Sequence, residues 1–182
     1  MARRTKRTHT YDSVALVLQG GGALGAYQAG AYCTLIGAGH PPDWVAGVSI
    51  GGINAALIAG NPPEHRAEKL RAFWEAVTPD IPYLAYGLND HGDRAFTQVS
   101  AMTSILTGVP GFFEPRMPPP WFQPEGTAAA LSFYDIAPLR RTLEGLIDFD
   151  RLNGGETRLS LGAVDVATGN SVYFDTDKQR VT

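Results

Sequence analysis

The order of apolar and polar positions predicts alternating strands and helices in the first half of the chain. A continuous apolar run at 14–18 precedes a glycine cluster and a nearly all-apolar segment at 25–36. The same order recurs at 44–48 and 50–59, and residues 64–77 have the apolar spacing of an amphipathic helix. Short, unbroken apolar runs are typical of strands that are buried on both faces. The pattern therefore predicts an α/β fold with a mostly parallel sheet.

The helix predicted at 25–36 is expected to be buried against that sheet. It contains Gly30, which costs about 1 kcal/mol relative to alanine inside a helix, so close packing of the backbone is expected there. It also holds the chain's single cysteine, Cys33, which we expect to be a small buried hydrophobic residue.

The second half of the chain is less regular. Prolines and glycines interrupt residues 79–126, and so long a connection favours a functional flap or an excursion over the surface. A helix is predicted at 134–147, and two strands at 157–166 and 171–174. The Thr-Gly-Asn sequence at 168–170 suits a hairpin turn between these strands.

Length, charge and cysteine content narrow the class of protein. The 182 residues fit one domain, expected at 13–182, after a disordered basic tail at 1–12. A net charge of −3 gives no overall attraction to nucleic acid, and no nucleic-acid partner is expected. One cysteine allows no internal disulfide and is typical of a reducing compartment. We expect a cytoplasmic protein, whose basic tail is either a solubilising end or a peripheral contact to anionic membrane.

The first glycine cluster, Gly20-Gly21-Gly22-Ala-Leu-Gly25, fits the pattern G-x-G-x-x-G between a predicted strand and helix. A P-loop is excluded because no lysine follows Gly25. A dinucleotide site needs an acidic residue at the end of the second strand, but Asp43 precedes that strand. A Rossmann-type dinucleotide binder is therefore the weaker alternative, and no cofactor is expected.

The second motif, Gly47-Val-Ser49-Ile-Gly51, fits G-x-S-x-G at a predicted strand-to-helix turn, the context of a nucleophile elbow. Its glycines remove side chains that would collide in so tight a turn. The Ser49 hydroxyl is then exposed at the positive end of the following helix. Backbone N–H groups of the first cluster can face the oxygen that becomes negative when a serine attacks an ester. Together the two motifs predict a serine nucleophile beside an oxyanion loop.

No histidine is placed to act as the general base. The usual order of Ser, Asp and His requires a late histidine, whereas all four lie in the first half of the chain, at positions 9, 40, 65 and 91. Residues 89–93, Asn-Asp-His-Gly-Asp, are interpreted as turn formers, and no metal is expected.

The segments GGGALGAYQAGAY and GVSIGGINAALIAG, with LSLGAVDVATGNSVYFD later, resemble the patatin-like phospholipases over residues 14–174. The resemblance implies a three-layer α/β/α fold and a Ser-Asp dyad that hydrolyses lipid or other acyl esters. By this resemblance Ser49 is the nucleophile, and Gly20, Gly21 and Gly22 supply the oxyanion amides.

The chain departs from that family pattern at two points. Leu24 stands where many members have Arg or Lys. The family aspartate lies in an Asp-Gly-Gly or Asp-Gly-Ala loop, and this chain has no Asp-Gly dipeptide. We therefore expect a C-terminally incomplete domain that is nearly inactive alone. Asp165 is a weaker candidate base, more typical of a turn-forming carboxylate. A non-catalytic lipid-binding module on the same fold is the remaining alternative.

The irregular segment is rich in aromatic residues, which favours a lipid substrate. Phe112, Phe113, Met117, Trp121 and Phe122 are candidates for a lipid-contact flap, because aromatic side chains favour membrane boundaries. The alternative is a long loop anchored by its own aromatic side chains.

Overall fold

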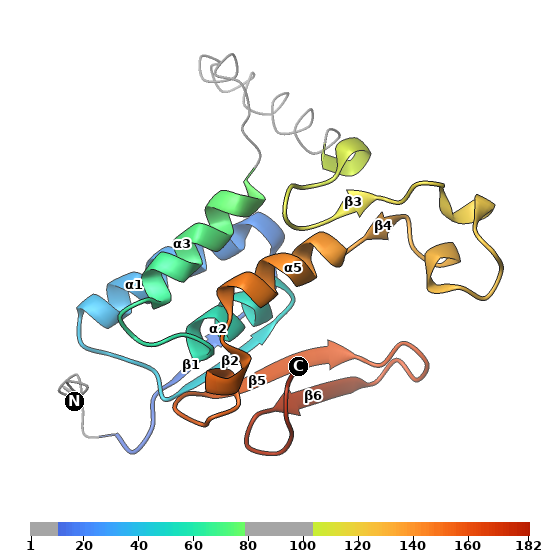
Figure 1. Ribbon diagram of the computed structural model, residues 1–182. Coiled ribbons are helices and arrows are strands. Elements are labelled where there is room, and N and C mark those ends of the chain that lie inside the picture. The colour runs from blue at the N-terminus through green and yellow to red at the C-terminus, as the bar shows by residue number, and fades with distance from the viewer. Residues whose placement is uncertain (1–10, 79–103) are drawn as a thin grey trace, which may run out of the picture. The chain divides into compact units, whose positions relative to one another are not determined.

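A computed structural model describes residues 11–78 and 104–182 of the chain (Figure 1). The chain divides into two units, unit 1 comprising Met1–Ala72 with Leu146–Thr182, and unit 2 comprising Phe73–Gly145. Most of the predicted disordered tail lies outside the described residues, and the expectation of one domain at 13–182 stays a prediction.

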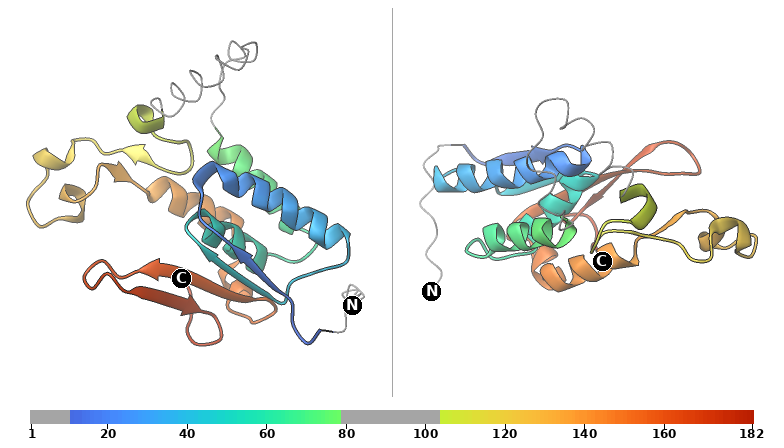
Figure 2. Two further views of the ribbon diagram at one scale, coloured as in Figure 1. Left: turned by 180° about the vertical axis from the view of Figure 1, so that it is seen from behind. Right: turned by 90° about the horizontal axis from the view of Figure 1, so that it is seen from above.

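A four-stranded sheet forms the centre of unit 1. Its strands, in spatial order, are β1 (Ala15–Leu18), β2 (Trp44–Val48), β5 (Arg158–Val164) and β6 (Ser171–Asp175). The β1–β2 and β2–β5 pairs are parallel, and β6 pairs antiparallel with β5. Figure 2 shows the β5–β6 hairpin, in red, at the side of the sheet away from β1, in blue. The predicted α/β class with a mostly parallel sheet is confirmed.

The helices of unit 1 follow the strands as predicted. A short 3-10 turn, η1 (Gly22–Leu24), leads into α1 (Gly25–Gly37), and β2 leads into α2 (Ile50–Ala59). The helix α3 (Arg66–Val77) begins in unit 1, and α6 (Phe149–Leu152) precedes β5. None of the helices in the described part of the chain combines the length and apolarity needed to cross a membrane.

The core of unit 1 lies between α2 and the sheet. Side chains of Val45, Leu57, Ile58 and Leu159 are fully buried there. The helix α2 is apolar all round and is buried along nearly its whole length, as expected of a helix packed on a sheet.

The prediction that α1 is buried is wrong. Only Gly25 and Tyr32 of this helix are buried, while Tyr27 and Cys33 are exposed. The close packing expected at Gly30 is also absent, since a Cβ there would meet nothing within 4 Å among the described residues. The reason is that α1 packs on α2 along one strip, which leaves its remaining surface uncovered in the described structure.

Unit 2 contains a two-stranded antiparallel ribbon, β3 (Glu114–Pro115) with β4 (Tyr134–Asp135), and the helix α5 (Ala137–Leu146), whose last residue belongs to unit 1. Two 3-10 turns, η3 (Pro120–Phe122) and η4 (Ala128–Ala130), lie between the strands. The predicted helix at 134–147 therefore begins late. Its first two residues pair with β3, and the Asp135 carboxylate accepts the N–H of Ala137.

The predicted hairpin between the last two strands is confirmed, with a shorter first strand. The strand β5 ends at Val164 because the turn begins at Asp165, which exchanges backbone hydrogen bonds with Gly169 and Asn170. Gly169 has a φ of 71°, a conformation that glycine adopts without strain.

Candidate active site

Ser49 occupies a strained turn between β2 and α2. Its φ of 53° and ψ of −131° make it the one non-glycine residue with positive φ in the described structure. Such conformations cost of order 1–3 kcal/mol and persist only where the surroundings enforce them. The side chain is exposed, and its hydroxyl has no hydrogen-bond partner among the described residues. The turn has the features of a nucleophile elbow, in which the serine hydroxyl is held out to receive a substrate.

The two glycines of the second motif make this turn sterically feasible. A Cβ on Gly47 would overlap the carbonyl of Gly51, and a Cβ on Gly51 would overlap the carbonyl of Leu18. The backbones of β1, β2 and the start of α2 therefore approach too closely for any side chain. The Ser49 carbonyl accepts the N–H groups of Gly52 and Ile53 and so begins the helix.

The first glycine cluster lies beside this turn. Leu18 pairs with Gly47 in the parallel β1–β2 ladder, so both motifs emerge at the same edge of the sheet. A Cβ on Gly20 would lie 3.3 Å from the Ser49 Cβ and 3.8 Å from its Oγ. The predicted neighbourhood of Gly20 and Ser49 is thus present.

The loop presents backbone donors that are not used elsewhere. Gly21 and Gly22 have φ values of 151° and 55°, and their N–H groups donate no hydrogen bond within the described residues. Free amides at the end of a strand, next to a serine hydroxyl, can receive the negative oxygen of a tetrahedral intermediate. The Leu24 side chain lies over Gly21, within 3.4 Å of a Cβ placed there, and gives this loop an apolar border.

Two residues that sequence reasoning missed connect the motifs. Asn54, fully buried in α2, donates to the Gly25 carbonyl at 2.9 Å and to Gln28 Oε1 at 3.3 Å. Gln28 in turn donates to the carbonyl of Gln19 at 2.7 Å. Both ends of the glycine loop are therefore held to the helix after Ser49. The available signal was the scarcity of polar residues in two nearly apolar helices, where Asn54 is the one polar residue of α2 and Gln28 is one of few in α1.

The Asp165 carboxylate forms hydrogen bonds within the hairpin turn that follows β5. It is half-buried and accepts the N–H groups of Ala167 and Thr168 and the Thr168 hydroxyl. The hydrogen bonds from Thr168 lower the pKa of Asp165, which makes it a weaker base. Val48 pairs with Gly162, so Asp165 lies three residues, about 10 Å, further along the strand. Its service as general base to Ser49 stays a prediction.

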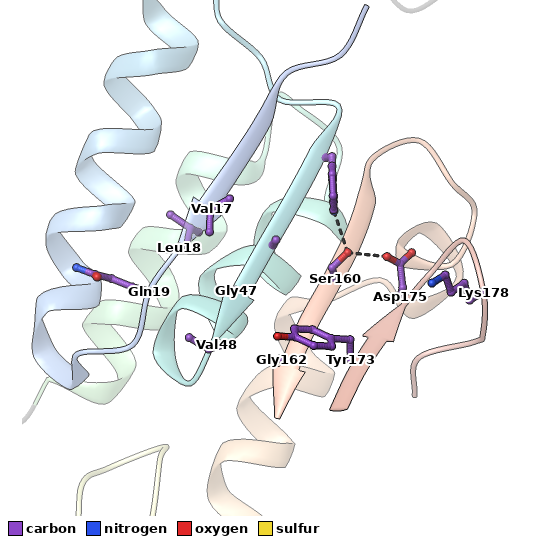
Figure 3. A pocket seen from close by; sticks show the side chains of 12 residues that line it. Val17, Leu18, Gln19, Gly47, Val48, Ser160, Gly162, Tyr173, Asp175 and Lys178 are labelled. Atoms are coloured by element: carbon purple, nitrogen blue, oxygen red, sulfur yellow. Dashed lines mark hydrogen bonds between the residues drawn. The ribbon is translucent and has the colours of Figure 1, made fainter. Parts of the chain in front are cut away.

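A hollow of about 470 Å³ lies on the sheet next to the two motifs (Figure 3). Val17 and Gln19 border it from the β1 side, and Val48 borders it beside Ser49. Tyr173 and Gly162 continue its wall on β6 and β5. The part of the hollow near Ser49 is therefore apolar and open to solvent, with Val17 75% exposed and Tyr173 73% exposed.

The far end of the hollow holds a polar network that the sequence did not reveal. Asp175, which is 7% exposed, accepts hydrogen bonds from the Arg158 guanidinium and from the Ser160 hydroxyl, the latter at 2.7 Å. Trp44 Nε1 donates to Ser160 Oγ at 2.8 Å, and the Arg158 guanidinium lies 4.4 Å from the Trp44 ring centroid. The hydrogen bonds from Arg158 hold the pKa of Asp175 well below its usual range. Because Trp44 begins β2 and Ser49 follows its end, this network stabilises the sheet away from the serine.

The predicted flap residues fall into two groups, both in unit 2. Phe112 and Phe113 are half-buried, with ring centroids 6.4 Å from Phe73 and 4.8 Å from Tyr134 respectively. Trp121 and Phe122 are 68% and 72% exposed. The first pair anchors the segment and the second pair faces solvent.

No group of three or more His, Cys, Asp and Glu side chains within the described ranges is arranged to hold a metal ion. The segment at 89–93, interpreted from sequence as turn-forming, lies outside those ranges.

The fold and the turn at Ser49 define an α/β protein with a serine held at a nucleophile-elbow turn, beside a loop of free glycine amides. The chain belongs to the patatin-like phospholipase family, whose model matches residues 16–182. Comparison with curated proteins and with solved structures found no match. The resemblance of the glycine motifs to this family is therefore confirmed, and membership implies lipid acyl hydrolase chemistry in general.

Proposed function

We propose that this protein is a serine acyl hydrolase that cleaves lipid esters with Ser49 as the nucleophile. The observation that carries the proposal is the strained φ of 53° at Ser49, next to Gly20 and the free amides of Gly21 and Gly22. A strained serine with an unpaired, exposed hydroxyl costs stability, and such strain is commonly found at functional sites.

In this reaction Ser49 Oγ attacks the carbonyl carbon of the ester. The hydroxyl proton passes to a general base, and the carbonyl oxygen becomes an oxyanion that accepts hydrogen bonds from the amides of the glycine loop. Collapse of the intermediate expels the alcohol, which takes up the proton. Water then hydrolyses the acyl-serine by the same steps and restores the hydroxyl.

The reaction needs a general base to take the proton from Ser49 Oγ. An aspartate acting directly on the serine is what the family resemblance implies, but no carboxylate in the described residues contacts Ser49 Oγ. The Asp165 carboxylate accepts hydrogen bonds from Thr168 in its own turn, and these lower its pKa. With no base beside Ser49 among the described residues, we expect slow turnover, since a serine hydrolase without its base typically loses about 10⁴-fold in rate.

The hollow beside Ser49 supports an apolar substrate. Val17, Val48 and Tyr173 border it near the serine, which suits an acyl chain better than a charged headgroup. A cytoplasmic protein in peripheral contact with membrane is the setting that we propose for such a substrate.

Labelling with a long-chain fluorophosphonate, read by intact mass, tests the nucleophile. We expect slow formation of a single adduct on the folded protein over a long incubation, absent from Ser49→Ala and retained in Ser171→Ala, a matched control at the start of β6. No adduct on a folded chain, or one that persists in Ser49→Ala, would overturn the proposal. Liposome binding without any Ser49-dependent labelling would favour a non-catalytic lipid-binding module.

A further inference from the structure

Unit 2 contains a segment whose two ends are held together by the pairing of β3 with β4. Residues 117–133, named here the apolar tip, lie between the paired strands β3 and β4. Arg116 closes the base, because its guanidinium donates to the carbonyls of Ser132 and Tyr134 and lies 3.9 Å from the Asp135 carboxylate. The Phe113 ring packs on Tyr134 directly below the tip. The segment is therefore held at its base by hydrogen bonds, an ion pair and ring packing.

The apolar tip exposes large apolar side chains and almost no charge. Its five most exposed large apolar residues are between 65% and 85% exposed: Met117, Trp121, Phe122, Leu131 and Phe133. Glu125 is the one charged residue in the seventeen positions. The Trp121 ring lies 6.3 Å from Phe122 and 6.2 Å from Phe133, so these three aromatic side chains form one cluster. Contiguous exposed apolar surface of this kind marks an interaction site.

Part of the backbone of the tip is satisfied without water. Four of its residues, at 118, 119, 120 and 124, are prolines and have no N–H to satisfy. Further N–H groups donate to carbonyls inside the tip, namely those of Phe122, Gln123, Thr127 and Ala130. The Gln123 side chain also donates inward, to the Pro118 carbonyl at 2.7 Å. Internal satisfaction of polar groups lowers the cost of leaving water for an apolar medium.

We propose that the apolar tip is a membrane-docking surface that inserts Trp121, Phe122 and Phe133 into the interfacial region of a lipid bilayer. The Trp121 indole N–H has no hydrogen-bond partner in the described structure, which suits a ring whose apolar body enters the acyl boundary and whose N–H meets the headgroups. A protein interface usually surrounds its apolar core with a polar rim, and Glu125 is the one charged side chain that the tip offers for such a rim. This surface lies in unit 2, and the proposal does not depend on the chemistry at Ser49.

Electrostatic attraction does not drive the proposed binding of the apolar tip to a bilayer. Residues 104–145 carry four acidic and three basic side chains, so an anionic surface is not attracted. Insertion of aromatic side chains requires only apolar burial, and therefore zwitterionic phosphatidylcholine is sufficient and salt has little effect. The basic tail at 1–12 would behave in the opposite way, since it needs anionic lipid and is screened by salt.

The test measures co-flotation of the full chain with phosphatidylcholine vesicles at low and high salt. All proteins carry Ser49→Ala, so that no ester is cleaved and docking is read separately from hydrolysis. We expect binding at both salt concentrations, and a loss of about tenfold or more in the double variant Trp121→Asp/Phe122→Asp. The control is Val166→Asp, which places one such charge on a 99% exposed residue of unit 1 and should bind normally.

A second measurement protects the test against misfolding of the double variant. Brominated phosphatidylcholine should quench the tryptophan fluorescence of the otherwise intact protein, and Trp121→Phe should bind normally while losing most of that quenching. Unchanged binding of the double variant, equal loss in Val166→Asp, or binding that requires anionic lipid and low salt would each overturn the proposal. A change in oligomeric state of the double variant without vesicles, with no change in flotation, would assign the tip to a second copy of the chain instead.

Discussion

Gly20 lies directly against Ser49, with 3.3 Å between a Cβ placed on Gly20 and the Cβ of the serine. The two residues are 29 positions apart in the chain and meet because β1 and β2 are parallel neighbours. Parallel strands bring their carboxyl ends to one edge of a sheet, where the loops that follow them become adjacent.

Gly20→Ala should slow fluorophosphonate labelling of Ser49 by about tenfold or more with little loss of stability, because a 1 Å displacement near reacting atoms can cost about 10²-fold. The added methyl group would crowd the serine side chain, yet the position needs no positive φ. Labelling kinetics and thermal unfolding measure the two effects. Gly30→Ala is the control: its Cβ meets open space in α1, so labelling should be unchanged and stability should rise by about 0.5–1 kcal/mol. Equal labelling rates in both variants would contradict the assignment of the oxyanion loop.

Ser49→Gly should be more stable than Ser49→Ala by about 1 kcal/mol, because glycine adopts the φ of 53° without the strain that a Cβ imposes. Both variants should lose labelling. Chemical denaturation of the three proteins measures the difference. Equal stability of the two variants would show that the turn is not strained.

Asn54→Ala should destabilise the protein by about 1–3 kcal/mol, since the Gly25 carbonyl loses its buried donor. It should also slow labelling of Ser49, because Asn54 holds the start of α1 and, through Gln28, the carbonyl of Gln19. Asn153→Ala serves as a control, since that residue ties α6 to the C-terminal segment at Val181 instead. Comparable slowing in both variants would remove the positioning role of Asn54.

Asp175→Asn should lower stability at neutral pH by about 1–3 kcal/mol and weaken the dependence of stability on acid. The carboxylate has a depressed pKa in the folded protein because Arg158 and Ser160 donate hydrogen bonds to it. A depressed folded pKa contributes stability above the unfolded value near 4, and that stability is lost as the pH falls below it. Urea unfolding at neutral pH and at acid pH gives the comparison. A variant whose stability falls with acid as steeply as the parent's would contradict this role.

The local elements of unit 1 were determined by the sequence itself. The predicted bounds 44–48 and 50–59 coincide with β2 and α2, and the glycines at 47 and 51 marked the strained turn between them. Such features follow from short-range sterics, because few residues other than glycine fit where backbones touch. The mostly parallel sheet followed from the alternation of apolar runs, and the family from the two glycine motifs with the later segment LSLGAVDVATGNSVYFD.

Only the tertiary structure decided which polar side chains act together and which aromatic side chains are exposed. Trp44 meets Ser160 across 116 positions, and Asn54 meets Gly25 across 29, contacts that no local pattern encodes. The helix predicted from 134 begins at Ala137 because Tyr134 pairs with Pro115 on a distant strand. Phe113 and Trp121 have similar sequence surroundings, yet ring packing on Tyr134 half-buries the first while the second stays exposed. Burial depends on which segments pack together, and that is a property of the whole fold.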